Sequence, residues 1–177
     1  MEVHGSVAIV ILNKSRNVMV FVKQFRPAIY ICEAELVQTE EKDTCRIDTQ
    51  KYPGSNGITY ELCAGIIDKD VDPVVIAQGE ILEECGYKVP IEQIEKITSY
   101  RSGVGVSGSR QHLFYAEVTD DMKVGQGGGV QAEGEMIDVV EIPVDKCMDF
   151  VMDEEINRPV GMMFAIMWFF ENKYKRT

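Results

Sequence analysis

The stretch that decides the fold runs from residue 61 to residue 87 and reads ELCAGIIDKDVDPVVIAQGEILEECGY. Asp72 followed by Pro73 predicts the start of a helix, because Asp is a favoured N-cap and Pro is favoured at the first helical position. Gly86 predicts the end of that helix, because glycine readily adopts the left-handed conformation that often follows the last turn. We therefore expect a helix over residues 73–85.

Three carboxylates of this helix share one face. Glu80, Glu83 and Glu84 are spaced i, i+3 and i+4, and like charges at this spacing repel by roughly 0.2–0.5 kcal/mol per pair. Such a cluster is either an ordinary solvated face or a site for a hard divalent cation, which prefers carboxylate ligands. The helix alone leaves both interpretations open. Its apolar positions fall elsewhere and can face a core: Ile76, Ile81 and Cys85.

Around this helix, the hydrophobic pattern predicts strands over residues 6–12, 17–24, 58–63, 91–99, 113–119 and 136–142. Helices are expected over 145–152 and 160–174, and the second is apolar nearly all round, so it should be mostly buried. Residues 31–57 lack periodicity and predict a loop insertion that is a lid, a partner surface or a tolerated surface loop. This order predicts an α/β/α sandwich around a mixed sheet.

Composition indicates a single domain over residues 1–177 of an ordinary globular protein. The five cysteines are scattered and form no C-x-x-C pair, which favours reduced thiols inside a cell over disulfides or a zinc site. No signal peptide pattern is present, and the longest apolar run, near residues 160–170, is too short to span a bilayer. A cytoplasmic protein is expected.

The net charge of −11 disfavours nucleic acids and anionic membranes as partners. It also opposes phosphate binding unless a cation is included, because a bound divalent ion can be the largest local charge in a site. The acidity therefore fits a metal-dependent enzyme better than one that relies on Lys and Arg alone.

Three segments outside the helix carry candidate site residues with ordinary alternatives. Arg26 follows a strand and is either a surface residue or a diphosphate ligand, since its planar donor fork suits phosphate. The Gly- and Ser-rich loop 100–110 can bring backbone amides close to a phosphate. Glu133 and Glu135 flank a glycine after the Gly-rich connection 125–129, and they suit either a solvated turn or a general base that closes over substrate.

The central stretch resembles the Nudix box, a loop–helix–loop signature that begins here at Gly65 and ends at Tyr87. The glutamates of the helix match the signature. The family's Glu six residues after the first Gly is Val71 here, and its Arg before the first helix Glu is Gly79. The metal-binding half of the signature is therefore intact, and two supporting positions depart from it.

Beyond the box, the chain resembles the ADP-ribose and UDP-sugar pyrophosphatase branch of the Nudix superfamily, over nearly its whole length from residue 6. The resemblance is carried by residues 22–27, the loop 102–110 and residues 133–139. ADP-ribose enzymes usually have a Ser-Pro-Gly-Gly-like loop, whereas residues 102–105 read SGVG here. This loop is similar to that of the animal UDP-glucose pyrophosphatases.

The resemblance implies roles for individual residues. The metal ligands would be the backbone carbonyl of Ala64 with the carboxylates of Glu80, Glu83, Glu84 and Glu135. The catalytic residues would be Glu83 and Glu84, with Glu133 as general base. The substrate would contact Arg26, Gly105, Ser109 and Arg110. The cofactor would be Mg²⁺, with Mn²⁺ as an alternative.

The implied reaction is hydrolysis of UDP-glucose to UMP and glucose 1-phosphate. One alternative is another nucleoside diphosphate sugar, such as ADP-ribose. A second is a catalytically weakened nucleotide-sugar binding module, which Gly79 and Val71 motivate. Relatives form homodimers partly through an N-terminal β-subdomain, and this chain starts almost directly at the first core strand. Either a homodimer uses other surfaces or this is a shortened form; a homodimer is the expectation.

Overall fold

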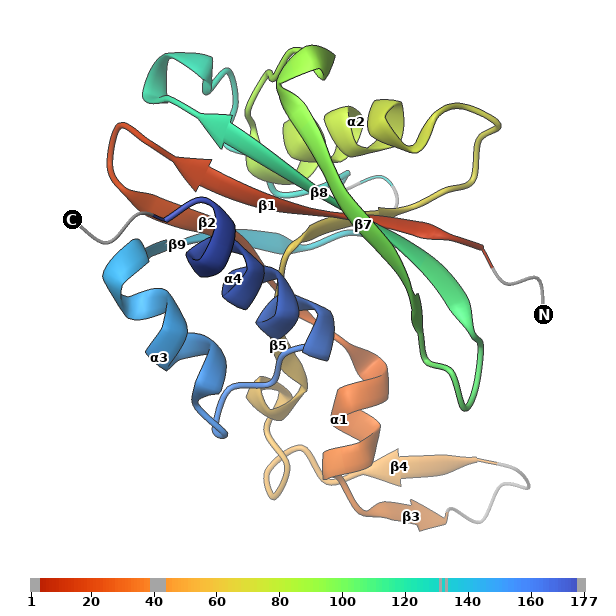
Figure 1. The fold of residues 1–177 in the computed structure, drawn as a ribbon. Helices are drawn as coiled ribbons and strands as arrows, with labels where there is room; N and C mark the ends of the chain where they lie inside the picture. Colours follow the sequence, from red (N-terminus) through yellow and green to blue (C-terminus); the bar gives the residue numbers. More distant parts are fainter. Residues whose placement is uncertain (1–3, 39–43, 131, 133, 175–177) are drawn as a thin grey trace.

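The fold is built on one mixed β-sheet (Figure 1). The computed structural model describes residues 4–38, 44–130, 132 and 134–174. Within these ranges, seven strands join in the order β5-β2-β1-β8-β7, while β6 also pairs with β1 and β9 with β2. Strands β1 and β8 run parallel and the other pairs are antiparallel. The strands are β1 (Ser6–Asn13), β2 (Val18–Phe25), β5 (Ile58–Glu61), β6 (Cys63–Ile66), β7 (Ile94–Ser102), β8 (Ser109–Val118) and β9 (Ile137–Pro143).

Helices cover both faces of this sheet, as Figure 1 shows. Alternation along β1 explains the two cores, because successive side chains of a strand point to opposite faces. Val7 and Ile9 belong to the core beneath one helix, whereas Ala8 and Val10 belong to the core beneath the other two. The predicted α/β/α sandwich is confirmed. The helices are α2 (Pro73–Cys85) on one face, with α3 (Cys147–Met152) and α4 (Val160–Asn172) on the other.

Helix α2 begins and ends where the sequence predicts. The Asp72 side chain accepts a hydrogen bond from the Val74 N–H at 3.0 Å, which satisfies one of the free donors of the first turn. Gly86 closes the helix with φ 75° and ψ 14°. The apolar positions that were expected to face a core are buried: Ile76, Ile81 and Cys85.

The expectation of an irregular insertion over residues 31–57 is wrong in part. Helix α1 (Pro27–Glu33) extends into it, and β3 (Leu36–Gln38) pairs with β4 (Cys45–Ile47) in a separate two-stranded sheet. In Figure 1 this hairpin and α1 lie away from the main sheet. Each strand has three residues, too few for an alternating pattern to be visible. Pro27 occupies the favoured first position of α1.

Several strand boundaries differ from the prediction, and the single strand expected over residues 58–63 is two strands, β5 and β6. Pro90 leads into a single 3-10 turn at Ile91–Gln93, so the next strand starts at Ile94. Strand β8 starts at Ser109, before the apolar run that signals it in the sequence. The loop between β7 and β8 is consequently short, and the Gly103 carbonyl accepts from three successive amides inside it.

Helix α4 is less buried than expected. Val160 is 78% exposed, Phe164 45% and Met167 51%, because one side of the helix meets the sheet while the other faces outward. The expectation of a mostly buried helix therefore holds for the side that meets the sheet and is wrong for the outward side.

The remaining general expectations concern cysteines and membranes. All five cysteines are free in the structure. Across the ranges that the structure describes, no helix combines the length and the apolar character needed to cross a membrane.

Candidate active site

Glu84 links the end of α2 to the strand that precedes the helix in the chain. Its carboxylate is nearly buried, and Oε2 accepts a hydrogen bond from the Ala64 N–H in β6 at 2.9 Å. Burial raises the pKa of Glu84 to about 8; the bond from Ala64 opposes this rise, and the charges of Glu80 and Glu135 add to it. The contact with Ala64 runs through its N–H, whereas the ligand predicted from the resemblance is its carbonyl.

Glu80 lies directly on the backbone of the first glycine of the box. A side chain at Gly65 would place its Cβ 1.8 Å from Glu80 Oε1, so only glycine leaves room for this carboxylate. Partial burial raises the pKa of Glu80 to about 7, and the charges of Glu83 and Glu135 contribute to the rise. Glu83 itself is exposed beside this pair.

Glu135 reaches the same place from a segment far along the chain. Its Oε2 accepts a hydrogen bond from the Val130 N–H at 2.7 Å. Its charge acts on both Glu80 and Glu84, so three carboxylates from two distant segments share one region. Glu133, the predicted general base, lies outside the described residues.

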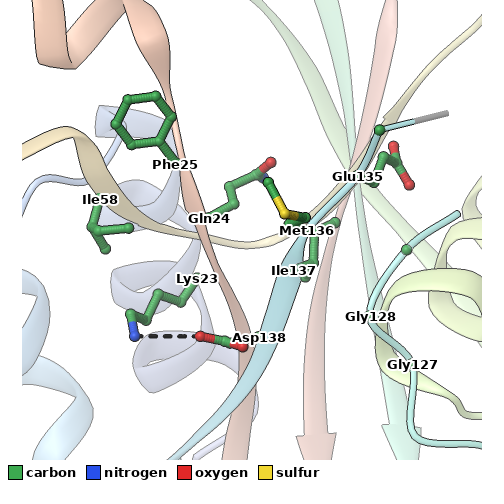
Figure 2. Close-up of a pocket in the computed structure, with 12 residues that line it drawn as sticks. Lys23, Gln24, Phe25, Ile58, Gly127, Gly128, Glu135, Met136, Ile137 and Asp138 are labelled. Atoms are coloured by element: carbon green, nitrogen blue, oxygen red, sulfur yellow. Dashed lines mark hydrogen bonds and ion pairs between the residues drawn. The ribbon is translucent and has the colours of Figure 1, made fainter. Parts of the chain in front are cut away.

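A pocket of about 850 Å³ opens beside Glu135. It is bounded by residues 23–25 of β2, the glycines of 127–129 and residues 134–138. Figure 2 shows Phe25 and Ile58 on one side of the pocket, with Glu135, Gly127 and Gly128 on the other side. Its volume falls within the range typical of pockets for small-molecule ligands.

The Arg26 side chain lies within the electrostatic influence of these carboxylates and forms an ion pair with Glu61. Its Nε and Nη2 donate to the two carboxylate oxygens of Glu61, both at 2.8 Å. The bond with Glu61 raises the pKa of Arg26, and the charges of Glu84 and Glu135 raise it further. The structure therefore brings this predicted substrate residue toward the carboxylates. Glu61, which orients it, carries no motif signal in the sequence.

Of the other predicted substrate residues, Gly105 lies in the loop between β7 and β8, and Ser109 and Arg110 are the first two residues of β8. Arg110 donates to Ser99 Oγ at 3.1 Å, Ser109 Oγ is 3.5 Å from the Ser102 carbonyl, and Gly105 has open space around it. A second cavity of about 330 Å³ is lined by Ala64 and Glu61 on one part of its wall. Residues 101–104, at the end of β7 and the start of the following loop, line another part.

Arg101, near the end of β7, is the positively charged residue that lines this second cavity. It was not among the candidates identified from the sequence. Arg101 and Arg110 are cross-strand partners at the base of the hairpin. The sequence pattern treats them alike, and only the strand register separates their surroundings.

The donor chemistry of the cluster fits a hard divalent cation. Among the described residues, no group of three His, Cys, Asp or Glu side chains is close enough together to hold a metal ion. The groups that converge are nevertheless carboxylate oxygens, the preferred ligands of such cations. A bound cation would favour the ionised forms of Glu80 and Glu84, whose pKa values are raised above the ordinary value.

Comparison with known proteins supplies the family. The chain is 43% identical to uridine diphosphate glucose pyrophosphatase NUDT14 of Bos taurus, over 96% of this chain and 79% of the relative. The corresponding protein of Mus musculus is 41% identical over the same shares. A GDP-mannose pyrophosphatase of Cronobacter sakazakii is 29% identical over 81% of this chain and 62% of the relative.

No family model matches the chain. The alignments with the bovine and mouse proteins nevertheless cover 96% of the chain, and so they include the box and the main sheet. The chain therefore belongs to the family of Nudix hydrolases that contains the NUDT14 pyrophosphatases.

Proposed function

We propose that this protein hydrolyses the diphosphate bond of UDP-glucose, with UMP and glucose 1-phosphate as products. The observation that carries the proposal is the convergence of Glu80, Glu84 and Glu135 beside Arg26 and a pocket large enough for a nucleotide sugar. The names of the bovine and mouse relatives support UDP-glucose as the substrate.

The reaction adds water across the diphosphate bridge. The water oxygen forms a new bond to one phosphorus, the bridging P–O bond breaks, and a base must take a proton from the water. We assign Glu133 as the base that takes this proton, because it lies two residues before Glu135 in the sequence. The bridging oxygen leaves with the second phosphate group.

We assign a divalent ion to the carbonyl of Ala64 and the carboxylates of Glu80, Glu83, Glu84 and Glu135, with Mg²⁺ as the ion and Mn²⁺ as an alternative. When bound, such ions neutralise diphosphate charge and lower the pKa of water. Arg26 would contact the diphosphate through the donor fork that Glu61 holds in place.

The test is Mg²⁺-dependent release of phosphate monoesters from UDP-glucose, ADP-ribose, GDP-mannose and a diadenosine polyphosphate. We expect the highest kcat/KM for UDP-glucose. A clear preference for another member of the panel would contradict the substrate assignment. Turnover of none of them would contradict the enzyme.

GDP-mannose and ADP-ribose stay the alternative substrates, and the Cronobacter relative supports the first of them. A binding module is the alternative of another class. It rests on Gly79, where a side chain would meet nothing closer than Glu83 Oε1 at 3.9 Å, so that position offers the glutamates no brace. Lys69 is a nearby cation whose charge acts on Glu80. A nucleotide sugar that binds without turnover would favour the module.

Three wider predictions accompany this function: a homodimer, a cytoplasmic location and a single domain over residues 1–177. Sedimentation velocity would test the first, microscopy of the tagged protein the second, and a single cooperative unfolding transition the third. None of them is needed for the reaction proposed above.

A further inference from the structure

The segment 125–129, which reads GQGGG and is called here the glycine strap, lies across the end of the box helix. The Gly128 N–H donates to the Glu84 carbonyl at 2.9 Å, and the Gly129 N–H donates to the Glu83 carbonyl at 3.1 Å. The last carbonyls of a helix have no partner within it, so the strap satisfies groups that would otherwise need water. The helix end and the strap are therefore held in a fixed register.

Close approach requires glycine in this segment. A Cβ at Gly127 would lie 2.2 Å from the Glu84 carbonyl oxygen, and a Cβ at Gly86 would lie 2.2 Å from the Gly125 carbonyl oxygen. The φ angles at Gly127, Gly128 and Gly129 are 74°, 108° and 76°, a region that side-chain-bearing residues rarely adopt. The backbone contacts of the strap thus depend on missing side chains.

The strap continues into the carboxylate cluster. The Val130 N–H donates to Glu135 Oε2, and the Ile137 N–H donates back to the Gly128 carbonyl at 3.3 Å. A Cβ at Gly129 would lie 2.6 Å from Glu135 Oε2 and 2.9 Å from Glu135 Cβ. The Glu135 side chain therefore rests against the backbone of Gly129, and a methyl group there would move it.

We propose that Gly129 is a positioning residue, whose bare backbone, fixed to the Glu83 carbonyl, sets the place of the Glu135 carboxylate relative to the box helix. The role rests on the proposed function, since Glu135 matters only if the cluster is catalytic. It explains why a glycine-rich connection joins two segments that carry carboxylates. The strap transmits the position of the helix end to a side chain from another part of the chain.

The test is a double-mutant cycle on UDP-glucose turnover with Gly129→Ala, Glu135→Gln and the double variant. We expect Gly129→Ala to lower kcat by about 10- to 100-fold with a smaller change in KM, as for groups that orient ligands. If Gly129 acts through Glu135, the double variant should be no slower than the slower single variant. Gly54→Ala is the control, because a side chain at Gly54 would meet nothing within 4 Å.

Wild-type kcat in Gly129→Ala, or additive losses in the double variant, would overturn the proposal. A second measurement tests the proposal if Gly129→Ala does not fold or if the wild-type protein does not hydrolyse UDP-glucose. Amide hydrogen exchange at Val130 should be at least about tenfold faster in Glu135→Ala, because the amide loses its acceptor. Unchanged exchange there would overturn the link between strap and carboxylate, whatever the substrate.

Discussion

At the residue scale, Glu84 combines burial, charge and one hydrogen bond in a single side chain. Glu84→Gln keeps an oxygen that can accept from the Ala64 N–H and removes the charge. We expect turnover of UDP-glucose to fall roughly 100-fold or more, beyond the effect of losing a supporting residue. The fold should persist, because the buried carboxyl group is replaced by a neutral amide of similar shape.

Steady-state kinetics and a thermal melt measure the two effects separately. Glu92→Gln is the matched control, since Glu92 is exposed on a single 3-10 turn outside the cluster. Near-normal turnover in Glu84→Gln would remove Glu84 from the catalytic machinery.

The Arg26–Glu61 pair gives a pH dependence with a defined sign. Burial raises the pKa of Glu61, but its bonds from Arg26 and Thr59 outweigh this and lower the pKa below the ordinary value of 4.5. The stabilisation is therefore fully present above that value and is lost as pH falls through the lowered pKa.

Urea unfolding of the wild type and Glu61→Gln from pH 7 to pH 3 measures this term. The difference in unfolding free energy between the two proteins should stay constant near neutral pH and shrink below about pH 4.5. A difference that grows as the solution becomes more acidic would show that Glu61 is not stabilised as a carboxylate.

How far the sequence predicts the site depends on how local each signal is. Asp72, Glu80, Glu84 and Gly86 lie on one helix, where spacing alone determines which side chains share a face. The bond from Arg26 to Glu61 depends on the pairing of β2 with β5, a register that the sequence does not specify. Arg101 and Arg110 show the same limit. Which of these two arginines lines the second cavity depends on the pairing of β7 with β8, which the sequence does not specify.

At the element scale, two glycines of the box helix should respond to alanine in opposite directions. Gly79 lies inside α2, and the nearest atom to an added Cβ would be Glu83 Oε1 at 3.9 Å. Gly79→Ala should stabilise the protein by about 1 kcal/mol, because glycine is a poor helix former. For a chain of this size, that corresponds to a rise in Tm of about 2–4 °C.

Gly86 ends the same helix with a positive φ, and a Cβ added there would lie only 2.2 Å from the Gly125 carbonyl oxygen. Gly86→Ala should therefore lower Tm, by more than the Gly79 variant raises it. Differential scanning calorimetry of both variants tests the pair. Shifts of the same sign would contradict this account of the helix and its cap.

Elements defined by tertiary pairing are the ones that sequence reasoning missed or misjudged. Helix α4 is apolar all round, yet Val160 and Phe164 face outward, since burial depends on which side meets the sheet. The β3–β4 hairpin has no pattern long enough to be recognised. The N-cap residue of α1 is Arg26, which makes no side-chain capping hydrogen bond, and the first turn carries no acidic residue. By contrast, β1 and β2 were predicted closely because long buried strands carry continuous apolar runs.

At the scale of the whole molecule, the candidate site lies where separate parts of the chain meet beside one end of α2. Ala64 lies on β6, and Glu80 and Glu84 lie on α2. Glu135 lies on the segment that follows the glycine strap, and Arg26 follows β2. The sheet fixes these parts relative to one another because β1 pairs with both β2 and β6. The net charge of −11 adds to the negative charge of this cluster, which a bound cation would offset.

The β3–β4 hairpin lies outside this framework, and the protein should tolerate its loss. Within its described part, side chains are exposed apart from the half-buried Ile47, so removal creates no cavity in either core. We expect replacement of residues 36–47 by a short Gly-Ser linker to change Tm by no more than about 2 °C, since loop length has a small effect on stability.

A melt of this variant beside Ile166→Ala calibrates the result. Ile166 is a fully buried residue of α4, and its truncation should destabilise the protein by about 2–5 kcal/mol. A fall in Tm comparable to that of Ile166→Ala would mean that the hairpin packs on the core or on a second copy of the chain. An unchanged melt with altered KM for UDP-glucose would instead identify the hairpin as part of the substrate surface, because its exposed side chains would then contribute to binding and not to folding.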